Sequence, residues 1–143
     1  MTNPTLPRKV LIIPCSGIGK SFGSVVREAA YRVSEDLRPE NSDIVPLSLL
    51  VMGDEAARQV VLESPVIALD GCKLACASKM VVESGARVDR SFDAMEVFRR
   101  YRDYKPQGIA ELNEGGMLLA RALGEEAAAE VDRLIMGGEE KNA

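Results

Sequence analysis

Residues 9–21, KVLIIPCSGIGKS, carry the first clear structural signal in the sequence. The apolar run at residues 9–14 is short and continuous, which is typical of a strand buried on both faces of a parallel sheet. Gly17, Gly19 and Gly23 follow the run and allow a tight turn. Apolar residues then recur at helical spacing, as Val25, Val26, Ala29, Ala30 and Val33. The pattern predicts a strand, a turn and a helix, which together form the first unit of an α/β fold.

Two further apolar runs and one weaker run predict the remaining strands. Residues 44–52, IVPLSLLVM, predict the second strand, and Pro46 indicates either an edge strand or a strand that begins after the proline. Residues 65–71, PVIALDG, predict the third strand. Residues 86–92, ARVDRSF, are a weaker candidate for a fourth.

The segments between these runs predict helices with recognisable ends. Residues 53–64 offer Asp54 as an N-cap. Residues 72–85, CKLACASKMVVESG, continue directly from the third strand as a helix, and Gly85 ends it. The expected apolar positions are Ala57, Val60 and Val61 in the first of these helices and Leu74, Ala77 and Val81 in the second.

Beyond residue 92 the sequence predicts helices only. Residues 93–105, DAMEVFRRYRDYK, have helical character. Residues 115–138 predict an amphipathic helix, and the chain after residue 136 is expected to be a frayed tail. The apolar positions of this amphipathic helix are Leu118, Leu119, Ala122, Ala129 and Leu134.

Strands that alternate with helices predict a parallel sheet with right-handed crossovers. We therefore expect an α/β protein with a small doubly wound parallel sheet of three to four strands, flanking helices and a C-terminal helix. The chain has 143 residues, of which 46% are hydrophobic, so it is long enough for one core and a second domain would be cramped. We expect a single domain over residues 1–143, with a helical extension over about residues 92–136.

Charge and the N-terminal sequence disfavour two classes of partner. A formal net charge of −4 gives no general attraction to nucleic acids or anionic membranes. The basic stretch FRRYRDYK at residues 98–105 would spread its charges around a helix rather than form one binding face. The N-terminal apolar run is too short for a signal peptide or a membrane span. We expect a cytoplasmic protein that binds neither nucleic acid nor a membrane and whose C-terminal helix either closes the core or pairs with a second copy.

Three cysteines and the lack of histidine limit the chemistry available to the chain. Without imidazole there is no Ser-His or Cys-His couple, and soft metal ligation must rest on sulfur. Cys15 ends the first strand, Cys72 follows the third strand, and Cys76 lies one helical turn further along. Ligands of open α/β sheets bind outside the carboxyl ends of the strands, so we expect the three thiols to converge there.

Several kinds of thiol chemistry fit this convergence. A thiolate is a nucleophile and a metal ligand, and its pKa falls at a helix N-terminus, where Cys15 and Cys72 are expected to lie. Three thiolates suit zinc or another soft ion and leave a fourth position for water, a small ligand or Asp70, whose plainer role is a turn or N-cap. A thiol enzyme that uses Cys15, and a redox or metalloid sensor that uses Cys72 and Cys76, remain open alternatives. Small sulfur side chains also pack as buried hydrophobes.

The glycine-rich loop in PCSGIGKS, residues 14–21, has phosphate-linked interpretations as well. It matches the end of the Walker A pattern, but Pro14 stands where the first glycine belongs. A thiolate beside a nest of N–H groups also fits a phosphatase cradle, in which Lys20 would supply the anion contact. Gly17, Gly19 and Lys20 are therefore candidate anion contacts, and a tight turn with a solvated lysine is the simpler interpretation.

The segment LDGCKLACASK, residues 69–79, together with PCSGIGKS upstream, resembles the DGC-domain family, which is inferred to bind zinc and is named for its Asp-Gly-Cys motif. The resemblance covers about residues 9–90. It implies zinc as the cofactor, held by residues that match three of the family's four inferred chelating cysteines, namely Cys15, Cys72 and Cys76. The fourth cysteine belongs near the end of the second strand, where this chain has Ser48. The resemblance thus implies a three-sulfur site with an open fourth position and names no activity.

Overall fold

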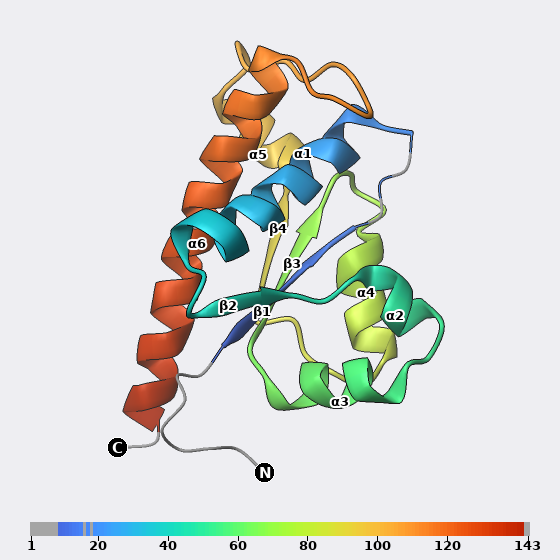
Figure 1. Cartoon of the computed structure of the whole chain (residues 1–143), viewed down its shortest axis with the longest axis vertical. Coiled ribbons are helices and arrows are strands. Elements are labelled where there is room, and N and C mark those ends of the chain that lie inside the picture. The colour runs from blue at the N-terminus through green and yellow to red at the C-terminus, as the bar shows by residue number, and fades with distance from the viewer. Residues whose placement is uncertain (1–8, 16, 18, 142–143) are drawn as a thin grey trace.

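A four-stranded sheet forms the centre of the molecule, with the strands in the order β2-β1-β3-β4 (Figure 1). The structure is a computed structural model that describes residues 9–15, 17 and 19–141. All neighbouring strands are parallel, which confirms the α/β fold expected from the sequence. The strands are β1 (Val10–Pro14), β2 (Ser42–Ile44), β3 (Val66–Asp70) and β4 (Arg90–Asp93).

The two central strands are the most buried strands of the sheet. Every residue of β3 is buried, as are the first four residues of β1. Ile12 pairs with Ile67 in the register that joins these two strands. The edge strands β2 and β4 are shorter and carry exposed polar residues. Burial on both faces therefore selects which strands lie in the middle of the sheet.

Helices cover both faces of the sheet (Figure 1). The chain leaves β1 toward β2 along one face and returns across β1 to β3 along the other. The carboxyl ends of β1 and β3 therefore form the topological switch point of the sheet. One face carries α1 (Ser21–Tyr31), the π-helical segment η1 (Arg32–Leu37), α5 (Ala94–Arg100) and α6 (Glu114–Lys141), and the other carries α2 (Leu47–Val51), α3 (Glu55–Glu63) and α4 (Cys76–Glu83).

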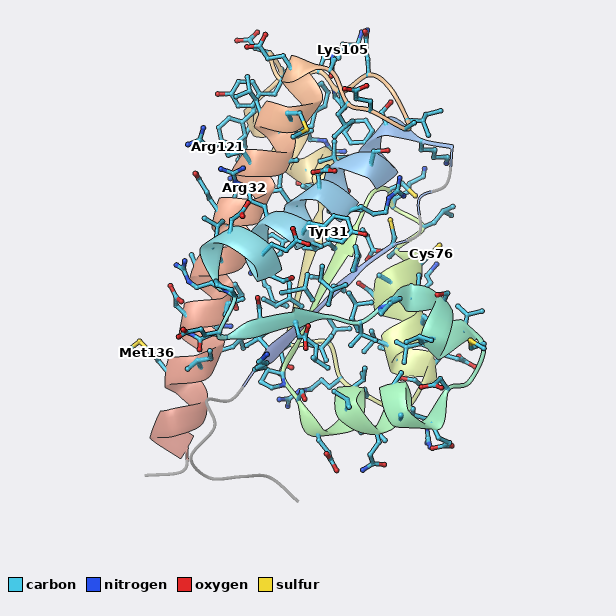
Figure 2. All side chains as sticks on the ribbon, viewed as in Figure 1. Tyr31, Arg32, Cys76, Lys105, Arg121 and Met136 are labelled. Atoms are coloured by element: carbon cyan, nitrogen blue, oxygen red, sulfur yellow. The ribbon has the colours of Figure 1, made fainter. Side chains whose placement is uncertain are left out.

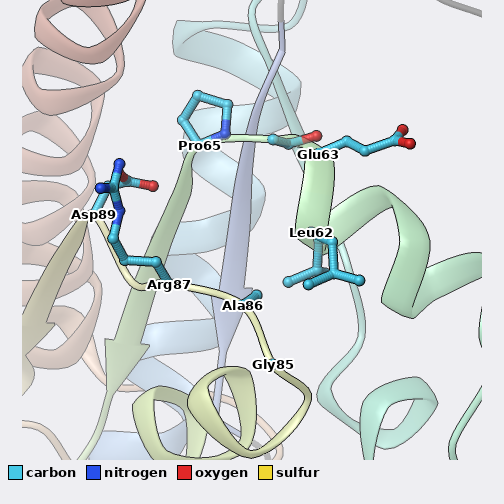
Figure 3. A pocket seen from close by; sticks show the side chains of 9 residues that line it. Leu62, Glu63, Pro65, Gly85, Ala86, Arg87 and Asp89 are labelled. Atoms are coloured by element: carbon cyan, nitrogen blue, oxygen red, sulfur yellow. The ribbon is translucent and has the colours of Figure 1, made fainter.

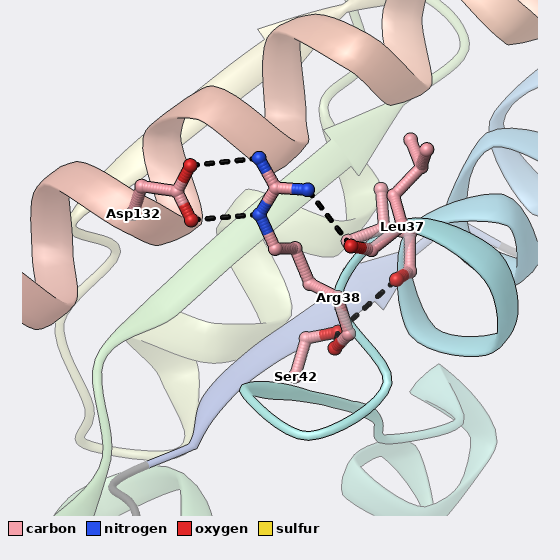
Figure 4. A network of polar contacts seen from close by, with 5 residues as sticks. Leu37, Arg38, Ser42 and Asp132 are labelled. Carbon is pink, nitrogen blue, oxygen red and sulfur yellow. Dashed lines mark hydrogen bonds and ion pairs between the residues drawn. The ribbon is translucent and has the colours of Figure 1, made fainter.

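The C-terminal helix α6 packs along α1 and closes the core. Its buried side includes Leu119, Leu123 and Val131. Near its far end, Arg38 donates two hydrogen bonds of 2.7 Å to the carboxylate of Asp132 (Figure 4). This bidentate pair joins α6 to the end of η1 and lowers the pKa of Asp132. Among the described residues, no helix is long and apolar enough to cross a membrane.

Two sequence-based predictions at the carboxyl edge are wrong in detail. The second strand lies at residues 42–44, before the predicted run at 44–52, because Pro46 has extended geometry and stands as the N-cap of α2. The helix predicted over residues 72–85 begins only at Cys76, after a turn. Leu74 therefore lies outside the helix, where it is 56% exposed.

Of the remaining elements, some follow the predictions and others do not. Asp54 caps α3 as expected, since its carboxylate accepts a 2.9 Å hydrogen bond from the N–H of Ala57. The fourth strand is present and ends at Asp93, which in turn accepts a hydrogen bond from the N–H of Met95. Helix α5 ends at Arg100, five residues earlier than expected. Helix α6 continues to Lys141, where a frayed tail was expected.

Replacement of Gly23 by alanine tests the contact between the first turn of α1 and the preceding loop. An added Cβ would lie 2.6 Å from the carbonyl carbon of Gly17, so the backbone would have to shift. We expect Gly23→Ala to reduce the free energy of unfolding by about 1–3 kcal/mol in urea denaturation. The control Gly137→Ala has nothing within 4 Å of the added methyl group, and helix propensity predicts a gain of up to about 1 kcal/mol. Equal effects of the two substitutions would contradict this close packing.

Candidate functional site

The candidate site lies at the switch point between β1 and β3. Cys15 follows the last residue of β1, and Gly71 and Cys72 follow the last residue of β3. The N–H of Gly71 donates a 3.3 Å hydrogen bond to Sγ of Cys15. The ends of β1 and β3 therefore lie together as predicted, and the hydrogen bond from Gly71 to Cys15 joins them.

Cys15 is the buried member of the three cysteines. Burial raises the pKa of its thiol above the ordinary value, and the hydrogen bond from Gly71 offsets part of that rise. The charges of Asp70, Cys72 and Cys76 raise the same pKa further. The direction is thus opposite to that expected from a helix N-terminus, because desolvation outweighs the hydrogen bond from Gly71.

Asp70 fixes the loop that carries the other two cysteines. Its side chain is 3% exposed, and its two oxygens accept hydrogen bonds from the N–H of Ala77 at 2.8 Å and from the N–H and hydroxyl of Ser78 at 3.3 and 2.7 Å. These bonds satisfy donors of the first turn of α4. The capping interpretation of Asp70 is therefore confirmed, and a metal would have to compete with three donors for its oxygens.

Cys72 and Cys76 lie on either side of a short turn. Ala75 closes that turn in the left-handed region, with φ 52° and ψ 47°. Cys72 is half-buried in the turn, whereas Cys76 is exposed at the start of α4 (Figure 2). The prediction that these two thiols lie one helical turn apart is wrong, because α4 begins only at Cys76 and Cys72 lies outside it.

The described residues do not form a preformed metal cage. Across residues 9–15, 17 and 19–141, no three side chains of the types His, Cys, Asp and Glu are grouped so as to hold a metal ion. The donor types suit a soft ion, since three sulfurs lie at one edge. Their arrangement would have to change for a metal to bind all three.

Ser48 lies near Cys15, although the second strand was predicted at the wrong residues. It is an exposed residue of α2, and together with Cys15 it lines a pocket of about 180 Å³. Because α2 begins directly after β2, the hydroxyl still reaches the carboxyl edge of the sheet. The side chains of Arg27 and Tyr31 line the same pocket. Sequence reasoning missed these two residues, since their only signal is a place on the exposed side of the first helix.

The glycine-rich loop forms a tight turn. Gly17 and Gly19 have φ values of 50° and 83°, which favour glycine. The N–H of Lys20 donates to the carbonyl oxygen of Gly17 at 3.2 Å, and the lysine side chain is exposed. The turn interpretation is confirmed by this backbone geometry, and an anion contact at Gly17, Gly19 and Lys20 stays a prediction.

A separate pocket of about 370 Å³ lies at the opposite edge of the sheet (Figure 3). Pro65 and Asp89, which precede β3 and β4, are among its lining residues. Asp89 accepts a hydrogen bond from the N–H of Val66 and pairs with Arg87, so its carboxylate supports the strand ends. None of the three cysteines lines this pocket, which places it apart from the candidate site.

The fold and the cysteine positions define an α/β protein that carries thiols at the switch point of a doubly wound sheet. The family model described as the DGC domain matches residues 11–115, and the chain belongs to the DGC-domain family. The match confirms the resemblance and extends it beyond residue 90. No curated protein and no solved structure matches the chain.

Alkylation of the metal-free protein tests the different environments of the three thiols. With iodoacetamide at pH 8 under reducing conditions, we expect Cys76 to react first, Cys72 next and Cys15 last. Cys15 is slowest because it is buried and its raised pKa leaves less thiolate at this pH. Peptide mass spectrometry over time measures the order, and protein unfolded in urea is the control in which the three rates converge. Fast modification of Cys15 in the folded protein would contradict the described geometry.

Proposed function

We propose that the protein is a cytoplasmic zinc-binding protein whose metal ligands are the thiolates of Cys15, Cys72 and Cys76. The main support is the position of all three at the carboxyl ends of β1 and β3, where open α/β sheets bind their ligands. In a chain without histidine, the soft ligands are the cysteine thiolates and the more weakly binding methionine thioethers. Membership of the DGC-domain family supports the same cysteine set.

Zinc binding requires the loop between β3 and α4 to adjust. Cys15 is held in place by burial and by the hydrogen bond from Gly71. Cys72 is half-buried in the turn and Cys76 is exposed at the start of α4, so the turn between them would have to rearrange to bring both sulfurs to the distance of about 2.3 Å from the metal that a zinc–sulfur bond needs. Asp70 would meanwhile keep α4 attached to β3.

Three thiolates leave one coordination position for another group. Ser48 stands where the resemblance places a fourth cysteine, but a neutral hydroxyl is a weak ligand, and a water molecule or a small ligand can take the position instead. When bound, zinc would supply a Lewis-acid centre there. Because thiol protons must leave when the metal binds, zinc affinity should fall as the pH is lowered.

Zinc titration of single-cysteine variants tests the shared site. Metal-free protein, kept reduced, is titrated in competition with a chromophoric chelator. Cys15→Ala, Cys72→Ala and Cys76→Ala should each weaken binding by more than the about 10- to 100-fold typical for a residue that only supports a ligand. Lys73→Ala is the matched control, since it changes the same loop without removing sulfur.

If any two of the cysteine replacements leave stoichiometry and affinity unchanged, the shared site is wrong. A wild-type protein that takes up no zinc, and instead forms a Cys72–Cys76 disulfide under mild oxidant, would indicate the redox alternative. The two outcomes are separated by mass spectrometry of the same samples.

Substitution of Ser48 by cysteine tests the open fourth position. Ser48→Cys supplies the soft ligand that the chain lacks at the end of β2, so zinc affinity should increase and ligand exchange at the metal should slow. Cobalt substitution measures the sulfur count from the intensity of the thiolate charge-transfer bands. The control Ser64→Cys adds a thiol at the opposite edge of the sheet. Equal affinities and identical cobalt spectra for Ser48→Cys and wild type would show that residue 48 does not face the metal.

A further inference from the structure

A further pocket lies where α1 and η1 pack beside α6, and charged side chains of both signs line it. It has a volume of about 190 Å³, and none of the three cysteines belongs to its wall. Positions of α1 and η1 that recur at helical spacing form one side, and α6 forms the other. Figure 2 shows Arg32 and Arg121 on the same side of the molecule. The charged lining residues are Glu28, Arg32, Glu35, Asp36 and Arg121.

Arg32 lies among acidic residues and pairs with none of them. Three carboxylates are three or four positions from it in the sequence, those of Glu28, Glu35 and Asp36. Other arginines of the chain form ion pairs at this spacing, namely Arg58, Arg99, Arg121 and Arg133. Arg32 itself has neither a hydrogen bond nor an ion pair within the part of the chain that the structure describes.

Packing against α6 holds this arginine away from the carboxylates. A Cβ added at Gly124 would lie 3.4 Å from Cδ and 3.6 Å from Cβ of Arg32, so the stem of the side chain lies over this glycine. Arg32 also begins η1, whose π-helical turn is wider than the α-helical turn that brings such pairs together. Its Nε atom is buried without a hydrogen-bond partner, whereas neither Nη atom is buried, so these two groups can donate to a ligand.

The pocket therefore presents positive and negative groups that do not neutralise each other by contact. An anion would meet the guanidinium of Arg32 but would be repelled by three carboxylates, and a cation would leave this guanidinium without a partner. A molecule with one charge of each sign can satisfy both. The exposed side chains of Tyr31 and Met117 add apolar surface beside the charges. The lining thus matches a zwitterion with a small apolar body.

Size limits the zwitterion further. A volume of about 190 Å³ equals roughly six waters at about 30 Å³ each, which suits a molecule of about six to nine non-hydrogen atoms. Small α-amino acids have this size. Their carboxylate can accept two parallel hydrogen bonds from one guanidinium, and their ammonium group carries three donors for nearby carboxylates.

We infer that this pocket binds a small zwitterionic α-amino acid, with its carboxylate on the Nη groups of Arg32. The ammonium group lies toward Glu28 and Glu35, and the apolar side chain lies against Tyr31 and Met117. The inference goes beyond the proposed zinc site and does not depend on it, because no thiol lines the pocket.

Titration with L-valine at pH 7, followed by NMR, tests this inference. We expect saturable shifts at the backbone amides of Arg32, Glu35 and Arg121, with a Kd on the order of 1 mM. Valinamide lacks the carboxylate and isovalerate lacks the ammonium group, so each should bind at least about tenfold more weakly than valine. Equal binding of valine and either analogue would overturn the inference, as would valine shifts that do not saturate.

Variants then assign the two charges. Arg32→Gln should weaken valine binding about 10- to 100-fold, and Arg32→Lys, which keeps the charge but not the fork, should give an intermediate loss. Glu35→Gln should weaken the binding of valine more than that of isovalerate, since only valine carries the ammonium group. The control Arg99→Gln removes an exposed charge on α5 and should bind valine like wild type. An amide spectrum close to wild type verifies that each variant is folded.

Wild-type affinity for valine in Arg32→Gln would contradict the assignment of the carboxylate. Zinc titration of the same variant, which should match that of wild type, keeps the two sites separate. Loss of zinc binding in the cysteine variants tests the metal site, whereas loss of valine binding in Arg32→Gln tests the pocket.

Discussion

The close approach of Gly71 to the start of α1 is the constraint on which the rest of the site depends. A Cβ at position 71 would lie 3.1 Å from the carbonyl carbon of Phe22 and 3.2 Å from the amide nitrogen of Gly23. A side chain at position 71 would force the end of β3 and the first turn of α1 apart by a few tenths of an ångström. The same approach brings the N–H of Gly71 to the sulfur of Cys15. The first two residues of the Asp-Gly-Cys sequence thus have structural roles: Asp70 caps α4, and Gly71 packs closely against the first turn of α1.

This arrangement gives the three thiols different environments. Burial raises the pKa of Cys15, which its neighbours hold in place, whereas Cys72 is half-buried in a turn and Cys76 is exposed at the start of α4. A soft ion would meet the exposed sulfurs first and reach the buried one only when the turn closes.

The sequence predicts the sheet better than it predicts the site. Continuous apolar runs identify β1 and β3 because burial on both faces leaves an unmistakable pattern. The run at residues 44–52 is misassigned, since a short apolar helix and a strand have the same composition and only Pro46 distinguishes them. Cys72 was predicted to lie on a helix because periodicity cannot show where that helix begins. In the structure α4 begins at Cys76, and Asp70 caps it from six residues earlier in the chain. Arg27 and Tyr31 were missed for a different reason: the pocket they line exists only once α1, β2 and α2 have packed together.

Cys15 stands where two neighbouring features of the carboxyl edge meet. On the β3 side it accepts a hydrogen bond from Gly71, and on the β2 side it forms part of the wall that contains Arg27. Cys15 therefore connects the fixed end of β3 with the surface between α1 and α2, so a change in either neighbour would alter the environment of its thiol.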